Sequence, residues 1–154
     1  MIYQGNKARL RPYIIPIIQK CIDENNITAY IEPFVGGANV IDHIKCEKRI
    51  GTDNNEELIE LLDYMRRNPN LSGFPEECSF EHYADVRQSR KDRTNKYTKA
   101  YTAGIGYFAS YGGRYFDGGY GRDAKGDRSI YAERLAYARK QVPLLKDIEF
   151  AVRD

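Results

Sequence analysis

The chain has 154 residues, of which 42% are hydrophobic and 30% are charged, so it can fold as one domain around a buried core. This composition excludes a disordered chain, and a formal net charge of only +2 argues against general adhesion to polyanions. Basic residues nevertheless concentrate in residues 87–140 and acidic residues in 53–63. This uneven distribution favours a local contact with a polyanion.

The three cysteines, Cys21, Cys46 and Cys78, are far apart, and the chain has only two histidines. The sequence therefore indicates neither a disulfide framework nor a metal site. The N-terminal residues lack the apolar core of a signal peptide, and no apolar run approaches the length that spans a membrane. We expect a soluble, cytoplasmic protein with no membrane partner.

The first 67 residues alternate between helical and extended patterns. The spacing of apolar residues predicts a bent helix over 7–22, kinked or divided at Pro16. The elements expected after it are a strand over 28–32, a glycine loop over 33–38, a helix of about two turns over 39–45, a strand over 49–53 and a helix over 56–67. Strand, helix, strand and helix in this order predict a parallel α/β core.

The composition changes after residue 68. Helical spacing predicts helices over 80–90 and 95–108, the second interrupted by Gly104 and Gly106. Residues 109–127 are rich in glycine, aromatic residues and arginine, which predicts a loop or hairpin. A helix over 129–142, capped by Ser129, and a strand over 147–152 complete the expected elements.

A candidate binding site lies between the two expected strands of the first half. A glycine-rich turn after a strand lets a ligand approach the backbone, and the helix that follows offers free N–H groups. Asp53, at the end of the next strand, is placed to accept hydrogen bonds from two ribose hydroxyls. The alternative also stands on the pattern alone, with Gly36 and Gly37 forming a simple turn and Asp53 capping a helix.

Two ordered segments and the acid after them carry a family resemblance. YQGNK at residues 3–7 and EPFVGGANV at residues 32–40, followed by Asp53, resemble the D12-class, or Dam-type, adenine-specific DNA methyltransferases. The family has a Tyr/Trp-x-Gly-x-Lys motif, a Glu-Pro-Phe-x-Gly-x-Gly motif and an acid that holds the ribose of S-adenosylmethionine. The resemblance implies an α/β protein with a partial Rossmann-like, S-adenosylmethionine-dependent methyltransferase fold and a helical or hairpin insertion like a target-recognition region.

The resemblance also assigns roles to five residues. Tyr3 and Lys7 would close the cofactor site from the N-terminal segment, with Lys7 facing the methionine carboxylate. Phe34 and Gly36 would pack along the methionine portion of the cofactor, and Asp53 would hold the ribose hydroxyls. S-adenosyl-L-methionine is thus the expected cofactor, bound weakly or not at all by these residues alone.

The sequence departs from the family in two places. Ala38 stands where the family usually has its second glycine, which adds one methyl group near the cofactor. The family's catalytic motif is Asp/Asn-Pro-Pro-Tyr/Phe, which accepts hydrogen bonds from the adenine amine and stacks on the flipped base. The chain has six prolines, no two of them adjacent, so this motif is absent from the sequence.

A second constellation lies in the glycine-rich stretch. Arginines reach phosphates and guanine edges, aromatic rings stack on unpaired bases, and glycines permit close backbone approach. We interpret Tyr107 and Phe108, which keep helical spacing, as core residues. The residues expected to contact DNA are Tyr111, Arg114, Tyr115, Arg122, Lys125 and Arg128.

Two classes of function remain open. In the first, the protein is a truncated or split DNA adenine-N6 methyltransferase, inactive alone, with a second polypeptide supplying the missing half. In the second, it is a non-catalytic protein of a phage or mobile element, such as an anti-defence inhibitor, that binds nucleic acid or a protein target. The expected regions are 1–67 for the start of the cofactor domain, 68–142 for DNA recognition and 143–154 for a returning strand. An exposed strand edge also makes self-association an expectation.

Overall fold

The computed structural model describes residues 1–123 and 128–153. The α-helices are α1 (Arg11–Glu24), α2 (Glu56–Arg67), α3 (Phe80–Lys91), α4 (Lys99–Ala109) and α5 (Ile130–Leu145). The strands are β1 (Ala29–Glu32), β2 (Lys48–Asp53) and β3 (Ile148–Val152), and the 3₁₀ turns are η1 (Lys7–Leu10), η2 (Ile41–His43) and η3 (Tyr111–Gly113). Among the described residues, no helix is long and apolar enough to cross a membrane.

The three strands form one parallel sheet in the order β1-β2-β3. Ile31 of β1 pairs with Ile50 of β2, and Gly51 of β2 pairs with Phe150 of β3. Parallel neighbours need crossover connections, and the one between β2 and β3 contains α2, α3, α4 and α5. The predicted parallel α/β class is therefore confirmed.

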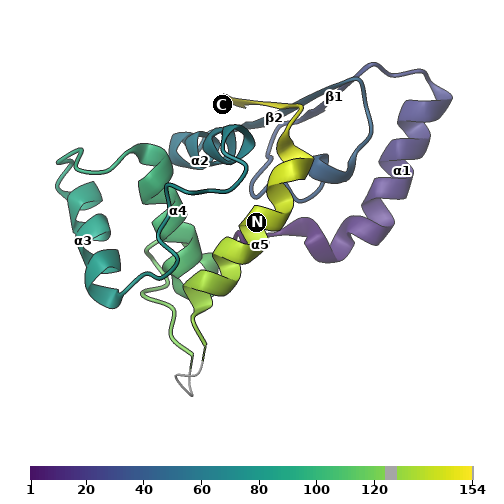
Figure 1. Ribbon diagram of the computed structural model, residues 1–154. Helices are drawn as coiled ribbons and strands as arrows, with labels where there is room; N and C mark the ends of the chain where they lie inside the picture. Colours follow the sequence, from purple (N-terminus) through teal and green to yellow (C-terminus); the bar gives the residue numbers. More distant parts are fainter. Residues whose placement is uncertain (124–127, 154) are drawn as a thin grey trace.

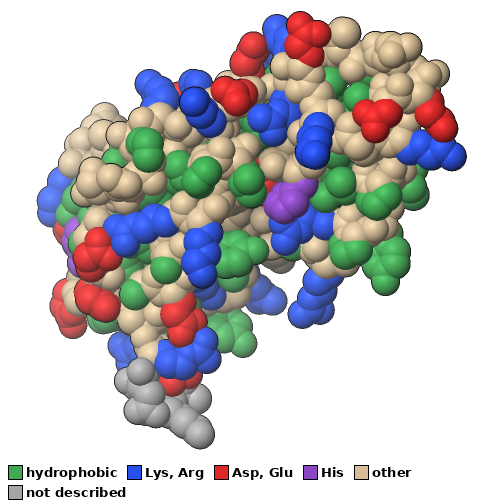
Figure 2. Space-filling view, turned by 45° about the vertical axis from the view of Figure 1, so that its right-hand side comes forward, with side chains coloured by type: hydrophobic (Ala, Val, Ile, Leu, Met, Phe, Trp, Pro, Cys, Tyr) green, Lys and Arg blue, Asp and Glu red, His purple; other side chains and the backbone are tan. Residues whose placement is uncertain are grey.

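The main core lies where α2, α4 and α5 meet, and α2 also packs against β3. Leu58, Leu61 and Leu62 form the buried face of α2, as their helical spacing predicts. α1 and α3 lie at opposite ends of the molecule, with the sheet and the other helices between them (Figure 1). The face shown in Figure 2 carries basic, acidic and apolar side chains side by side rather than a field of one charge.

Most of the predicted elements are confirmed, and the bounds of α2 agree with the sequence prediction. The Ser129 hydroxyl accepts a hydrogen bond from the Ala132 amide at 3.2 Å, so the predicted cap of α5 is also present. α1 continues through Pro16, and the break in the first helical segment falls instead between η1 and α1, where Pro12 occupies the first turn. Proline is well tolerated there, because a first-turn N–H has no helical partner.

The helix predicted over 39–45 is wrong, because only the short 3₁₀ turn η2 forms there. The Ile41 amide donates to the Glu32 carboxylate at 3.0 Å instead of to a helical carbonyl. The side chains of Asn39 and Asp42 bond to Met1 and Gln141, which are distant in the sequence. Tertiary hydrogen bonds thus replace the helix that local propensity favours.

The predicted interruption of α4 is also wrong. The helix runs without a break from Lys99 to Ala109, although Gly104 and Gly106 lie inside it. A Cβ atom on Gly104 would overlap the Phe74 ring, and one on Gly106 would overlap the rings of Tyr115 and Phe116. These glycines therefore let aromatic rings approach the helix backbone closely.

Candidate functional site

A cavity of about 300 Å³ opens at the carboxyl ends of β1 and β2. Ligands of open α/β sheets bind at this end of the strands, where loops and helix N-termini converge. All five residues predicted to hold a cofactor line the cavity, although they come from three separate segments. The lining residues are Tyr3, Gly5, Asn6, Lys7, Glu32, Phe34, Val35, Gly36, Gly37, Asn39, Val40, Asp53 and Asn54.

Asp53 connects the glycine loop to the start of α2. One carboxylate oxygen accepts a hydrogen bond from the Gly36 amide at 3.1 Å, and the other accepts from the Asn55 amide at 3.1 Å. Asn55 is the cap of α2, since its side chain accepts from the Leu58 amide. Asp53 is only 8% exposed. It is therefore a fixed carboxylate in the cavity wall, and capping α2 is the task of Asn55.

The glycine loop bends sharply beside the N-terminal segment. Gly36 has a φ of +49°, and a Cβ atom there would lie 3.0 Å from the Tyr3 ring. Ala38 has a φ of +55° and is fully buried. This left-handed conformation explains why glycine suits the position, and an alanine there stores about 1 kcal/mol of backbone strain. Phe34 lies at the mouth of the cavity with 78% of its surface exposed.

Glu32 is the site residue that sequence reasoning did not select. It is 8% exposed, and its pKa is raised to about 7, chiefly because burial penalises the charged form. Lys7 partly opposes this effect, with its Nζ 3.8 Å from the Glu32 carboxylate and 3.3 Å from the Phe34 carbonyl. The sequence did contain a signal for Glu32, since it is an acid at the end of an expected strand, immediately before the glycine loop.

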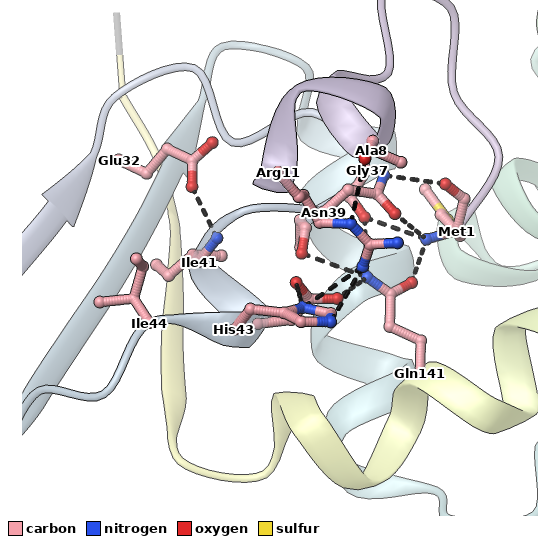
Figure 3. Close-up of polar contacts among 12 residues, drawn as sticks. Met1, Ala8, Arg11, Glu32, Gly37, Asn39, Ile41, His43, Ile44 and Gln141 are labelled. Atoms are coloured by element: carbon pink, nitrogen blue, oxygen red, sulfur yellow. Dashed lines mark hydrogen bonds and ion pairs between the residues drawn. The ribbon is translucent and has the colours of Figure 1, made fainter. Parts of the chain in front are cut away.

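Polar contacts from the N-terminus and from α5 support the glycine loop, as Figure 3 shows. The Met1 amino group donates to the Gly37 carbonyl at 3.1 Å and to the Asn39 side chain at 3.2 Å. Gln141 of α5 reaches the same loop from the far end of the sequence. Asp42 pairs with His43 at 2.6 Å beside these contacts. The loop is therefore held by hydrogen bonds from both the N-terminus and α5.

The residues predicted to contact DNA fall into two groups. Tyr111, Arg114 and Arg122 are exposed, and the Arg122 guanidinium lies over the rings of Phe80 and Tyr120 at 5.2 and 5.8 Å. Arg128 is exposed but forms a two-point ion pair with Glu133. Lys125 lies outside the described residues.

Tyr115 faces the interior instead. Its ring lies 4.8 Å from that of Tyr107, and its hydroxyl donates to Glu57 at 2.5 Å. The Arg90 guanidinium covers the ring at 4.9 Å and also pairs with Glu57. Burial raises the pKa of Tyr115, so the hydroxyl remains a proton donor. Tyr107 and Phe108 are buried, which confirms their interpretation as core residues.

Comparisons with known proteins identify a family for the chain. The family model for D12 class N6 adenine-specific DNA methyltransferases matches residues 3–103. The chain belongs to this family. The match includes the cavity, ends within α4 and does not reach the loop over 110–128.

Two curated relatives show the same partial similarity. The Type II methyltransferase M1.LlaDCHI of Lactococcus lactis subsp. cremoris is 31% identical over 105 residues, which cover 59% of this chain and 37% of the relative. The Modification methylase StsI of Streptococcus sanguinis is 34% identical over 67 residues, which cover 44% of this chain and 10% of the relative. The chain thus matches about a third of the first relative and a tenth of the second.

Proposed function

We propose that these 154 residues bind S-adenosylmethionine in the 300 Å³ cavity and contact DNA through residues 110–128, without transferring a methyl group by themselves. The observation that carries the proposal is the convergence of Tyr3, Lys7, Phe34, Gly36 and Asp53 on one cavity. The protein is DNA adenine methyltransferase-like by family, and the cavity is lined by the residues that match the family's cofactor-binding motifs in sequence.

The chemistry of the lining suits this cofactor. The methionine end of S-adenosylmethionine is a zwitterion, which requires both a cation and an anion from the protein. Lys7 can pair with its carboxylate and Glu32 with its ammonium group, since both side chains line the cavity. Asp53 has fixed carboxylate oxygens for the ribose hydroxyls. The cofactor, when bound, would supply the methyl group.

Methyl transfer needs groups that these residues lack. No Asp/Asn-Pro-Pro-Tyr/Phe motif is present, so nothing in the sequence matches the group that would orient the adenine amine or stack on a flipped base. We propose that such a motif comes from polypeptide outside these 154 residues, as in a truncated or split enzyme. Residues 1–67 would then serve the cofactor, 68–142 the DNA and 143–154 the returning strand.

Calorimetric titration of S-adenosylmethionine into the parent and into Asp53→Asn tests cofactor binding. We expect weak binding by the parent and at least tenfold weaker binding by the variant, because a charge-assisted hydrogen bond contributes about 1.5–3 kcal/mol. Asp23→Asn on α1 makes the same chemical change outside the cavity and should bind like the parent. A parent that binds no cofactor, or an Asp53→Asn variant that binds equally well, contradicts the assignment.

A radiolabelled methyl-transfer assay on mixed-sequence DNA tests the rest of the proposal. The purified 154-residue chain should leave adenine unmodified even at saturating cofactor. Adenine methylation by this chain would show that it orients the adenine amine without the family motif.

A further inference from the structure

We propose that Gln141 is a positioning residue that holds the glycine loop in its cofactor-binding conformation. This inference rests on the proposed function of the cavity and adds a residue from outside the segment that the family model matches. Gln141 does not line the cavity, so it would act through the loop rather than by touching the ligand.

The Gln141 side chain is 5% exposed and uses both ends of its amide. Its Nε2 lies 3.0 Å from the Gly37 carbonyl, 3.2 Å from the Ala38 carbonyl and 2.7 Å from an Asp42 carboxylate oxygen. Its Oε1 accepts from the Met1 amino group. One side chain from α5 therefore holds the loop and the N-terminal segment together (Figure 3).

These contacts lead directly to the cavity wall. Gly37 follows Gly36, whose amide donates to Asp53, and Ala38 is the residue with the left-handed φ. Hydrogen bonds to the Gly37 and Ala38 carbonyls, which lie on either side of the Ala38 Cα atom, restrain this strained turn. The Met1 contact restrains the segment that places Tyr3 against Gly36. The glycine loop and the N-terminal segment form the two walls of the cavity where the methionine end of the cofactor would bind, and both thus depend on the Gln141 amide.

Only an amide fits these surroundings. The NH₂ group faces three acceptors, whereas the carbonyl oxygen faces a donor. The charged or titratable groups around it are the Met1 amine, Asp42, His43, Arg11, Lys140 and Tyr137. Burial lowers the pKa of the Met1 amine to about 5, so at neutral pH it is largely uncharged and has two hydrogens to share among its three acceptors on Gly37, Asn39 and Gln141. A carboxylate at position 141 would face Asp42 and two carbonyls without a proton to donate.

The test compares Gln141→Glu with the parent in two measurements at pH 8 and pH 6. The first is the dissociation constant of S-adenosylmethionine, which we expect to rise at least tenfold relative to the parent at pH 8. At pH 6 the ratio should fall below threefold, because a proton shared between the new carboxyl and Asp42 restores one hydrogen bond. The second is amide hydrogen exchange of residues 33–43 without cofactor, which should accelerate at least tenfold while α2 and α4 keep their protection.

Gln88→Glu is the matched control. The Gln88 amide on α3 also donates to a carboxylate, Asp92 at 2.8 Å, but it lies outside the cavity and the glycine loop. This variant should bind the cofactor within twofold of the parent at both pH values. Gln141→Met, an uncharged side chain of similar length, replaces Gln141→Glu if the latter does not fold, with the same tenfold thresholds and no recovery at pH 6.

The outcomes separate the inference from the proposed function. Cofactor binding by Gln141→Glu within twofold of the parent at pH 8, or unchanged exchange of residues 33–43, overturns the positioning role. A parent that binds no cofactor refutes the proposed function, and the exchange measurement then decides the positioning role alone. Hydrogen exchange that accelerates equally in α2, α4 and residues 33–43 also overturns the positioning role, because Gln141 would then support the whole fold.

Discussion

Glu32 is the residue whose ionisation the cavity perturbs most. Its pKa is raised to about 7 by burial, against partial relief from Lys7 and the Ile41 amide. Between the unfolded pKa, near 4.5, and about 7, the folded protein holds a proton on this carboxyl that the unfolded chain has released. The free energy of unfolding therefore decreases as the pH rises through this window and levels off above it.

Glu32→Gln removes this dependence while keeping an oxygen that can accept from the Ile41 amide. We expect the free energy of unfolding of the variant to rise relative to that of the parent between pH 5 and pH 8, by at most about 3 kcal/mol. Screening by solvent reduces this gain. Urea unfolding at several pH values measures the difference. Glu149→Gln, on the exposed part of β3, should show no such gain, and parallel pH profiles for Glu32→Gln and the parent would contradict a raised pKa.

The site residues that sequence reasoning found belong to short motifs. Tyr3, Lys7 and Gly36 were identified because their neighbours form a recognisable local pattern, and the structure brings them to one cavity. Gln141 could not be found this way, since its partners lie about a hundred residues away and its own segment reads as an ordinary helix. Glu32 was visible in the motif, but its raised pKa depends on burial that only the folded chain creates.

At the scale of elements, α4 depends on close aromatic packing against its glycines. Alanine is the better helix former by about 1 kcal/mol, so propensity alone predicts that Gly104→Ala stabilises the protein. The added Cβ would overlap the Phe74 ring, which is stacked on Tyr101 at 5.4 Å. We expect the free energy of unfolding to fall by about 1–3 kcal/mol. Denaturant unfolding of the parent and of Gly104→Ala measures this change in the free energy of unfolding.

Phe74→Leu tests whether overlap with the Phe74 ring causes the loss of stability in Gly104→Ala. Combined with Gly104→Ala, it should remove part of the loss expected from the two single substitutions, because the smaller side chain leaves room for the Cβ atom. Strictly additive losses would show that the ring is not the obstacle.

The loop over 110–128 carries the prediction about DNA. Arg114→Ala and Arg122→Ala should each weaken binding to duplex DNA and reduce the salt dependence of that binding. A variant that makes one phosphate contact fewer releases fewer counterions from the DNA when it binds. Fluorescence anisotropy across a salt series measures both effects. Lys20→Ala, on α1, removes the same charge outside this loop and should leave binding unchanged. Equal binding by all four proteins at low salt would exclude this loop as the DNA contact.

Elements were predictable where local pattern and tertiary structure agree. α2 has an asparagine cap and a regular apolar face, so its bounds followed from the sequence. The expected helix over 39–45 failed because Glu32, Met1 and Gln141 provide the hydrogen bonds of this segment. The glycines of α4 read as interruptions because their ring partners are distant in the sequence.

At the scale of the whole molecule, β1 and β3 are the two edges of the described sheet. β1 carries Ile31 with 53% of its surface exposed, and η1 and α1 expose Leu10, Tyr13 and Ile17. Apolar side chains reach the surface among charged ones in Figure 2. An unpaired edge with exposed apolar residues is a template for pairing with another strand, which is why we expect self-association.

Ile31→Lys should shift the protein toward the monomer, because a charge on an edge strand opposes edge-to-edge pairing. Sedimentation velocity over a range of protein concentrations measures the change. Leu144→Lys, at an exposed position of α5, introduces the same charge outside the strands of the sheet and should leave the association unchanged. A parent that stays monomeric at the highest concentration, or an Ile31→Lys variant that associates equally, contradicts this expectation.

The pairing of β2 with β3 also determines when the sheet can be completed. Arg49 is paired with Ile148, so about a hundred residues must be synthesised and brought together before this register exists. Contacts so distant in sequence slow folding, because the entropy of closing the chain is lost before the pairing forms. On the ribosome, the glycine loop would emerge long before Gln141 and β3. The loop would therefore reach its final shape among the last events of folding.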